Sequence, residues 1–433
     1  MDIRGIIKSP SIRNFTKLLS ANVVAQVIGL IVYPILTRIY APEDFGLLNL
    51  FLSIGGVLTI ISTAEYYYAI VLPKEHKQAV AVLWTGVLCL ILTGGVVCLS
   101  VFFATPIASL LKTPLLASYY WMMPFYVMAM GGWNLLNYWY IRTTKYSRIS
   151  HYQISQSILS AGGKMGFGYL GILQGGMIYS VVLAPLVALV VSFITWKPIA
   201  ILRKRVMNFN VSWQDICKQT KEYKNFPLFV LPRSFVNMLA GQMPVLLLTP
   251  FFGSKLVGFY SLALLLGYTP IGTITRAVYQ VLYQQTTERV HKSLPIGNIF
   301  KRFIIYASII IVPVFIGLYF ILPEITSWIF GKEWYVSGEY IRWMLPWLYV
   351  SFVSCSINYL FDVFMKQKWG LFFEVLLALV RVLGLVIGVR MNSFIVAIAS
   401  YSIGTTLALM IQLLWMLMLV RRYDRSLSGE QLD

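Results

Sequence analysis

The chain has 433 residues, of which 58% are hydrophobic and only 12% charged, and its mean hydropathy is +0.74. A soluble domain carries about a quarter charged residues, so this composition excludes a soluble globular protein. The 35 Lys and Arg residues outnumber the 16 Asp and Glu residues and give a net charge of +19. These cations are dispersed over many loops, which argues against nucleic acid as a partner.

Apolar runs about 20 residues long recur from one end of the chain to the other, and each can cross a bilayer core as a helix. A spanning segment must satisfy its own backbone hydrogen bonds in lipid, so the runs are expected to be helical. The pattern predicts an all-α polytopic membrane protein with about 12 transmembrane helices. In chain order the predicted spans are 15–37, 46–66, 79–103, 118–141, 150–170, 177–197, 226–250, 257–282, 302–322, 340–362, 369–389 and 394–420.

The connections between these spans alternate in charge. Most Lys and Arg residues lie in the N-terminal tail, the even-numbered connections and the C-terminal tail. The odd-numbered connections hold only Arg38, Lys112, Lys255, Lys332 and Arg390. By the positive-inside rule, both termini of this multi-pass protein are predicted to be cytoplasmic. The basic loops are also expected to contact anionic membrane lipids.

Two halves of the chain echo one another. The segment Phe45-Gly46-Leu47-Leu48-Asn49-Leu50 aligns with Val257-Gly258-Phe259-Tyr260-Ser261-Leu262 at an offset of 212 positions. Each half contains six spans, so the two halves share one orientation and predict two six-helix lobes related by a parallel pseudo-repeat. The predicted domains are an N-lobe at 1–197, a cytoplasmic linker at 198–225 and a C-lobe at 226–433.

The linker contains Ser212-Trp213-Gln214-Asp215, which has the spacing of a helix N-terminal capping box. The residues that follow predict an amphipathic helix that lies on the inner membrane surface.

Charged residues within spans are expensive in lipid and are therefore candidates for function. Lys164 lies in span 5 and Arg381 in span 11, which are equivalent spans of the two halves, and Arg233 and Arg276 lie in spans 7 and 8. We interpret these four residues as a cationic cavity. For Lys164, the neighbouring glycines are expected to leave room for a ligand or another backbone. Snorkelling of Arg233 and Arg276, or a structural pair of Glu374 with Arg381 or Lys164, is the open alternative.

Polar residues at helical spacing predict a wet lining for this cavity. The polar lining candidates are Asn22, Gln26, Asn237 and Gln280. Two acids in spans, Glu374 and Glu65, are the candidates for coupling transport to H⁺ or Na⁺.

Patterns typical of enzymes are absent or misplaced. The dinucleotide-like run Gly166-Phe167-Gly168-Tyr169-Leu170-Gly171 lies inside span 5 with no strand before it. The three histidines are scattered without metal-ligand spacing, and no P-loop lysine motif or catalytic triad is visible. We expect no cofactor, no metal and no catalytic residue, and therefore a protein that is not an enzyme.

Two stretches carry a family resemblance. Ser20-Ala21-Asn22-Val23-Val24-Ala25-Gln26 and the run from Pro34 to Gly46 resemble the opening of bacterial polysaccharide transporters, the O-antigen (Wzx-type) flippases of the multidrug/oligosaccharidyl-lipid/polysaccharide exporter superfamily. The resemblance implies two six-helix lobes around a cationic cavity. It also implies export of undecaprenyl-pyrophosphate-linked oligosaccharide, with a polysaccharide polymerase and glycosyltransferases as working partners.

Two alternatives remain on sequence alone. A multidrug-type or lipid II exporter would share the fold, although cationic drugs require acids rather than bases in the cavity. A membrane glycosyltransferase or polymerase would need acidic residues on a large outer loop, and all outer loops of this chain are short.

Overall fold

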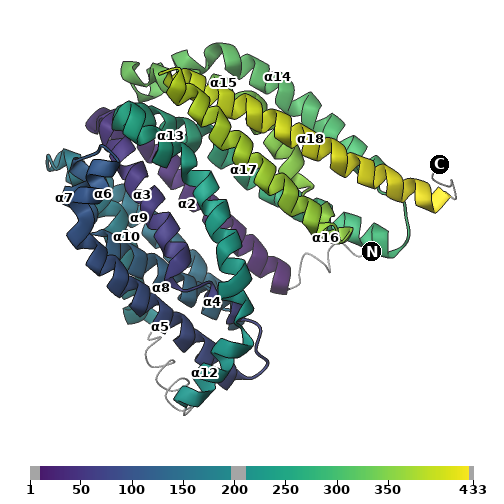
Figure 1. Ribbon diagram of the computed structural model, residues 1–433, viewed down its shortest axis with the longest axis horizontal. Coiled ribbons are helices and arrows are strands. Elements are labelled where there is room, and N and C mark those ends of the chain that lie inside the picture. The colour runs from purple at the N-terminus through teal and green to yellow at the C-terminus, as the bar shows by residue number, and fades with distance from the viewer. Residues whose placement is uncertain (1–9, 197–210, 429–433) are drawn as a thin grey trace. The chain divides into compact units, whose positions relative to one another are not determined.

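The computed structural model describes residues 10–196 and 211–428, and these described residues are helical with no strand (Figure 1). The long helices of the first part are α2 (Pro10–Ile39), α3 (Pro42–Ser62), α5 (His76–Ser100), α8 (Met123–Arg142), α9 (Tyr146–Tyr169) and α10 (Leu173–Trp196). Those of the second part are α13 (Leu231–His291), α14 (Gly297–Phe330), α15 (Tyr335–Ser356), α17 (Gln367–Arg390) and α18 (Phe394–Ser428). Each predicted span coincides with one of these helices or with one half of α13.

The helix α13 is two spans joined by a break. Gly253 has φ 79° and ψ 169°, a conformation that interrupts helical geometry and that glycine adopts without strain. The break lies between the predicted spans 226–250 and 257–282, so the all-α fold with twelve spanning segments is confirmed.

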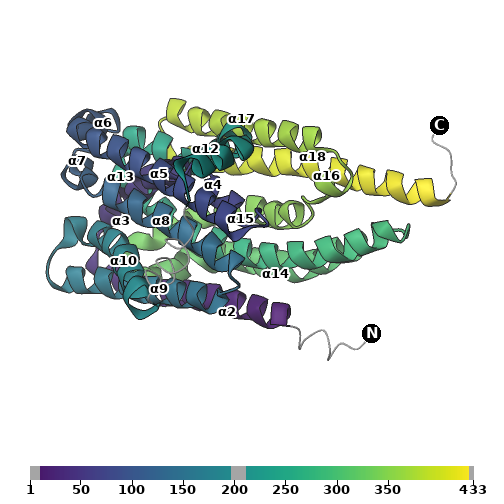
Figure 2. The same ribbon diagram turned by 90° about the horizontal axis from the view of Figure 1, so that it is seen from below.

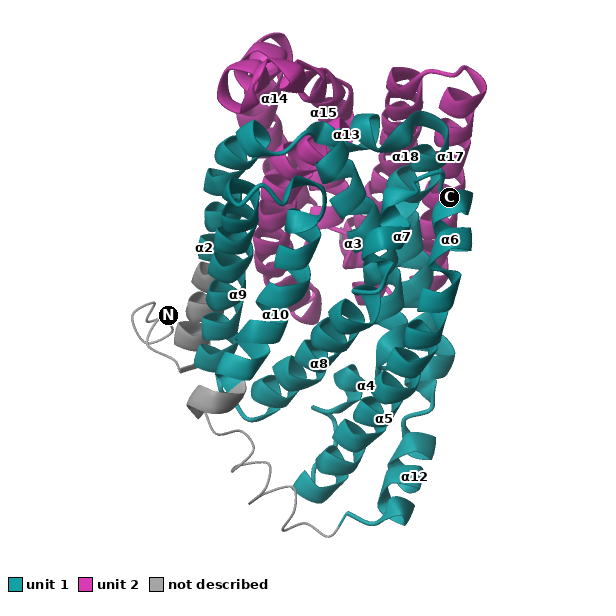
Figure 3. Cartoon of the chain, turned by 90° about the vertical axis from the view of Figure 1, so that its left-hand side faces the viewer, with its two compact units in different colours: residues 1–258 teal, residues 259–433 magenta. Residues whose placement is uncertain are grey.

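The chain forms two compact units, residues 1–258 and 259–433 (Figure 3). The first half of α13 belongs to the first unit. The division of the chain into lobes at 1–197 and 226–433 therefore remains a prediction, and part of its linker, 197–210, lies outside the described residues.

The repeated glycines meet each other inside the first unit. A Cβ atom on Gly46 would collide with the backbone carbonyl of Ser254, and one on Gly258 would collide with that of Pro42. Ser254 stands 212 positions after Pro42, as Gly258 does after Gly46, so the two contacts are related by the repeat. The Lys255 ammonium also forms an ion pair with Glu43, the residue at the corresponding position of the first repeat, at 3.5 Å. The parallel pseudo-repeat read from the sequence is thus built into the packing.

A methyl group at this crossing should destabilise the protein. We expect Gly258→Ala to lower the free energy of unfolding by about 2 kcal/mol, because the added carbon meets backbone that cannot rotate away. Gly241→Ala on the same long helix is the matched control, since nothing lies within 4 Å of its Cβ position and alanine favours helix. Thermal unfolding of the purified protein measures both. Equal melting temperatures for the two variants would show that the crossing is not tight in solution.

Span 2 ends earlier than the predicted 46–66. The helix α3 stops at Ser62, and the next turn carries Ala64 and Glu65 in left-handed conformations, with φ of 47° and 61°. Such conformations cost about 1–2 kcal/mol for a residue with a Cβ. A short helix, α4 (Tyr66–Ala69), then leads out of the span. The break places Glu65 outside helical geometry, a feature that hydropathy alone does not reveal.

Arg142, at the end of α8, secures the segment that follows α4. Its guanidinium donates hydrogen bonds to four backbone carbonyls, those of Ile70, Val71, Pro73 and Glu75, at 2.7–3.3 Å. Only arginine presents enough donors in a fixed fork to satisfy such a set.

The predicted linker helix is present as α12 (Trp213–Glu222). The Ser212 hydroxyl accepts the Gln214 N–H at 3.1 Å, and Asp215 accepts the Ser212 N–H at 2.9 Å, so the capping box is confirmed. The Lys77 ammonium, which hydrogen-bonds Asp215, and the Ser212 N–H hold the pKa of this carboxyl below its usual range. The contact between α12 and α5 is therefore strongest above that range and weakens as the pH falls through the lowered pKa.

In the second unit, α17 and α18 lie side by side (Figure 1 and Figure 2). Gly384 and Gly388, four residues apart on α17, press directly against Ser400 and Ala397 of α18. This is the small-residue spacing that lets membrane helices approach closely. The Ser400 hydroxyl donates a hydrogen bond to the Gly384 carbonyl at 2.6 Å.

Arg342 repairs a proline break in α14. Pro323 lacks an N–H, so the carbonyl of Tyr319, four residues earlier, loses its helical partner. Arg342 donates through Nε to that carbonyl at 2.5 Å and through Nη2 to the Phe320 carbonyl at 2.9 Å. Its charge therefore has a structural role in the second unit.

Candidate functional site

Lys164 projects from α9 onto an aromatic face in the first unit. Its ammonium lies 5.9 Å from the centroid of the Tyr33 ring on α2, and the Tyr33 ring in turn contacts Phe45 at 5.8 Å. The Tyr40 hydroxyl donates to the Lys164 carbonyl at 2.7 Å and ties the two helices together. A cation over an aromatic face gains about 0.5–2 kcal/mol, which offsets only part of the cost of a charge in lipid.

The glycines near Lys164 lie on different faces of α9. Gly162 and Gly166 have nothing within 4 Å of their Cβ positions, but each is two residues from Lys164. Two residues turn a helix by about 200°, so this open face points away from the lysine side chain. At Gly163 another helix approaches, because Ser180 of α10 lies 3.0–3.6 Å from its Cβ position. The predicted room for another backbone is therefore present there, and room for a ligand beside Lys164 stays a prediction. The face of α9 that carries Lys164 packs toward α2.

Arg381 repeats this arrangement in the second unit. Its guanidinium lies 5.8 Å from the centroid of the Tyr401 ring on α18, and its Nε is buried with no hydrogen-bond partner. An orphaned buried donor costs about 1–3 kcal/mol, more for a charged group. The deep cation of each half thus faces a tyrosine, and the Arg381 Nε–H remains available to donate a hydrogen bond.

Arg381 and Arg276 are both within electrostatic range of the Tyr268 hydroxyl. The Tyr268 ring stacks on Trp347, with ring centroids 5.7 Å apart. Trp347 also meets the Tyr401 ring edge-on at 5.5 Å, and its Nε1 is buried without a partner. Arg381 and three aromatic rings of the second unit therefore share one region, and Arg276 is within electrostatic range of one of these rings.

Within the described residues of its own unit, neither deep cation has an acidic partner. The ion pairs of the structure join other residues, and Glu374, one heptad before Arg381 on α17, is exposed. The alternative in which Glu374 and Arg381 form a structural pair is thus contradicted. An unpaired cation in a membrane span needs water or an anion to lower its energy.

The remaining cavity candidates lie at open surface. Arg233 and Asn237 are exposed on the first half of α13, and Arg276 and Gln280 are exposed on the second half. Gln26 is half-buried on α2, whereas the side chain of Asn22 lies outside the described residues. Each half of α13 therefore exposes two polar residues four positions apart, and their role as a cavity lining stays a prediction.

Glu65 is the most enclosed acid that the structure describes, with 1% of its surface exposed. It hydrogen-bonds Tyr67 and the Ser234 hydroxyl of α13, while its Oε2 has no partner. The rings of Tyr67, Tyr68 and Tyr138 gather beside it, with centroids 4.4–5.1 Å apart. A carboxyl buried without a cation is costly when ionised, so the binding of H⁺ or Na⁺ by Glu65 stays a prediction that the enclosure is compatible with.

Sequence reasoning missed three features of these sites. Tyr401 was not distinguished from the other aromatics, Ser234 was overlooked beside Arg233, and the close packing at Gly384 and Gly388 was not noted. Only the last had a signal, the four-residue glycine spacing. No cluster of three or more potential metal ligands occurs among the residues that the structure describes.

A family model described as polysaccharide biosynthesis protein matches residues 35–339, which is well over half of the chain. The chain belongs to this family. The resemblance to polysaccharide transporters read from the N-terminal motifs is therefore confirmed. Among curated proteins, none matches the chain.

Solved structures place this family member in the fold of the multidrug/oligosaccharidyl-lipid/polysaccharide exporter (MOP) superfamily. An inward-facing multidrug resistance MATE family transporter is 15% identical, with a TM-score of 0.73 over 92% of this chain and 96% of that one. The lipid II flippase MurJ in an inward closed conformation is 14% identical, with a TM-score of 0.69 over 96% and 93%. A MOP superfamily transporter from Pyrococcus furiosus, described as having a binding pocket of reverse polarity, is 16% identical, with a TM-score of 0.56 over 95% and 96%. At these identities the likeness shows the fold: the chain is a multi-pass membrane protein with a transporter architecture.

Proposed function

We propose that the protein is a flippase that moves undecaprenyl-pyrophosphate-linked oligosaccharide, the repeat unit of O-antigen or another surface polysaccharide, between the leaflets of the bacterial cytoplasmic membrane. The observation that carries the proposal is the pair of deep cations, Lys164 and Arg381, each facing a tyrosine and lacking an acidic partner in its unit. A pyrophosphate supplies the missing negative charge, and charge-assisted hydrogen bonds to it are strong. Membership in a polysaccharide biosynthesis family supports the same class of substrate.

The aromatic groups beside the cations suit the sugar part of such a substrate. Tyr401 lies against Arg381, and Trp347 and Tyr268 continue the aromatic surface, so one region of the second unit offers both a phosphate donor and stacking faces. A multidrug exporter for cationic drugs would instead need acids at the positions of Lys164 and Arg381. The chemistry thus favours an anionic lipid-linked sugar.

Transport in this proposal proceeds by alternating access, with both termini in the cytoplasm and H⁺ or Na⁺ as the driving ion. Glu65 is the coupling residue that the geometry favours. It is enclosed and has an unpartnered oxygen, whereas Glu374 is exposed on α17. An ion that binds at Glu65 can affect α3, α8 and α13 together, because the residues around it come from these helices and the turn that follows α3. The polymerase and glycosyltransferases of the same polysaccharide are the expected partners.

Complementation tests the proposal directly. In a host that lacks its own polysaccharide flippase, the wild-type chain is expected to restore surface polysaccharide and to remove the accumulated lipid-linked repeat unit from the inner leaflet. The control is a host depleted of its lipid II flippase. Growth of that host, without any polysaccharide in the first one, would overturn the proposal in favour of a lipid II exporter.

A further inference from the structure

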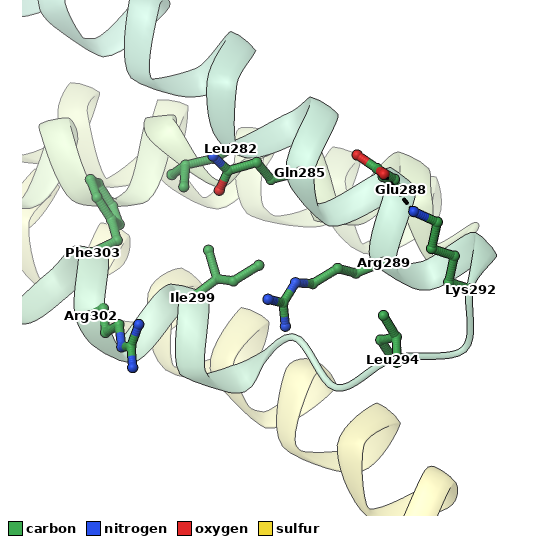
Figure 4. Close-up of a pocket in the computed structure, with 9 residues that line it drawn as sticks. All are labelled: Leu282, Gln285, Glu288, Arg289, Lys292, Leu294, Ile299, Arg302 and Phe303. Atoms are coloured by element: carbon green, nitrogen blue, oxygen red, sulfur yellow. Dashed lines mark hydrogen bonds and ion pairs between the residues drawn. The ribbon is translucent and has the colours of Figure 1, made fainter. Parts of the chain in front are cut away.

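A basic pocket lies in the second unit, away from the deep cations, where α13 ends and α14 begins (Figure 4). Its volume is about 600 Å³. Leu282, Gln285, Glu288 and Arg289 line it from α13, Lys292 and Leu294 from the turn, and Ile299, Arg302 and Phe303 from α14. Three cations and one acid therefore share the rim of a small hollow.

The charged side chains of this pocket are only partly engaged in ion pairs and hydrogen bonds within the described chain. Lys292 is neutralised by Glu288, whose carboxylate lies 2.6 Å from its ammonium. Arg289 donates through Nη1 to the Pro295 carbonyl at 3.1 Å, which fixes its guanidinium and leaves its other donors available. In Figure 4 the Arg289 side chain extends from α13 into the space between the two helices, toward Ile299. Arg302 adds a second exposed guanidinium from α14.

Apart from Gln285, the remainder of the lining is apolar, and this apolar surface continues along an exposed face of α14. Leu282, Ile299 and Phe303 form the apolar side of the pocket. Further along α14, four large apolar side chains are 44–66% exposed, those of Ile305, Tyr306, Ile309 and Ile310. Most of the apolar stretch of this helix is likewise not buried by the rest of the described chain. A free phosphate ion would leave this apolar surface uncovered, whereas the acyl chain of a lipid would pack against it. A basic pocket between spanning helices is the kind of site that takes an anionic lipid headgroup.

We propose that this pocket binds the phosphate of an anionic phospholipid, with Arg289 and Arg302 on the headgroup and an acyl chain along α14. The ligand is a lipid of the surrounding membrane and not the transported substrate. Bound lipid would link the end of α13 to the start of α14. The N-terminus of α14 is already secured from the other side, because Asp424 of α18 accepts the Ile296 and Gly297 N–H groups at 2.8 and 2.7 Å.

Native mass spectrometry and thermal unfolding of the full-length protein, with phosphatidylglycerol or phosphatidylcholine added, test the site. We expect wild type to retain phosphatidylglycerol in preference to phosphatidylcholine and to melt at a higher temperature with it. Each lost cation should weaken phosphatidylglycerol binding about fivefold, so Arg302→Gln loses about fivefold and Arg289→Gln with Arg302→Gln about thirtyfold. Arg302 makes no hydrogen bond or ion pair within the described part of the chain, so its single variant keeps the test valid if Arg289→Gln misfolds.

The matched control is Lys366→Gln with Lys368→Gln, which removes two exposed cations from another basic connection of the same unit. This variant should bind phosphatidylglycerol like wild type. An equal loss in the control variant would show general surface charge and overturn the pocket. Stabilisation by inorganic phosphate without any by phosphatidylglycerol would assign the site to a free anion and overturn the lipid. Because transport is not measured, failure here leaves the proposed flippase function standing.

Discussion

Alanine at Lys164 or at Arg381 is expected to stop polysaccharide export while leaving the protein in the membrane at normal levels. A charge-assisted hydrogen bond contributes about 1.5–3 kcal/mol, so loss of either cation should reduce export about ten- to a hundredfold. The fold should survive, because removing an unpaired charge from lipid relieves a desolvation cost. Surface polysaccharide in a flippase-deficient host gives the activity, and immunoblotting of membranes gives the amount of protein.

Three further variants sharpen this test. Lys368→Ala, at the exposed start of the helix that carries Arg381, should retain export. Arg381→Lys should recover part of it, since an ammonium attracts phosphate but cannot bind it through a bidentate fork. Tyr401→Phe should be nearly silent, because the aromatic face beneath Arg381 is kept. Full activity of both alanine variants would end the cationic-site mechanism, and loss of the protein from the membrane would assign the two cations a structural role.

Replacing Glu65 by glutamine is expected to uncouple transport from its driving ion. The amide keeps the size of the carboxyl and can still hydrogen-bond Tyr67 and Ser234, but it neither takes up a proton nor neutralises Na⁺. In proteoliposomes, an imposed H⁺ or Na⁺ gradient should accelerate flipping by wild type about tenfold or more, following the free energy that one ion crossing a membrane supplies. The Glu65→Gln protein should be insensitive to the gradient.

Glu374→Gln is the matched control for this experiment, because it removes the other candidate acid from an exposed position. It should respond to the gradient as wild type does. A reversed outcome, with Glu374→Gln insensitive and Glu65→Gln responsive, would move the coupling site to α17. An unfolded Glu65→Gln protein would show instead that the carboxylate holds the break between α3 and α4 together.

The helices, their number and the repeat could be predicted from the amino-acid sequence. In lipid a spanning segment must form all of its backbone hydrogen bonds internally, so an apolar run of about 20 residues is a helix, and hydropathy is enough to locate it. The capping box at Ser212 and the repeat that relates Gly46 to Gly258 could also be predicted, because each depends on residues at a fixed spacing. The candidate cations Lys164 and Arg381 were found for a similar reason, since any charge inside an apolar run is conspicuous.

What the sequence could not determine was the surroundings of those charges. Hydropathy records that Glu65 and Glu374 both lie within apolar runs, yet one is enclosed at a left-handed turn and the other is exposed. Burial depends on which helices pack against a residue, and those helices come from distant parts of the chain. The same reason applies to Gly162 and Gly166, whose open face of α9 points away from Lys164, and to Tyr401, which only the close contact of α17 with α18 brings to Arg381. Spacing along the chain therefore predicts which helix carries a charged residue, whereas the burial of that residue and its neighbours depend on tertiary contacts.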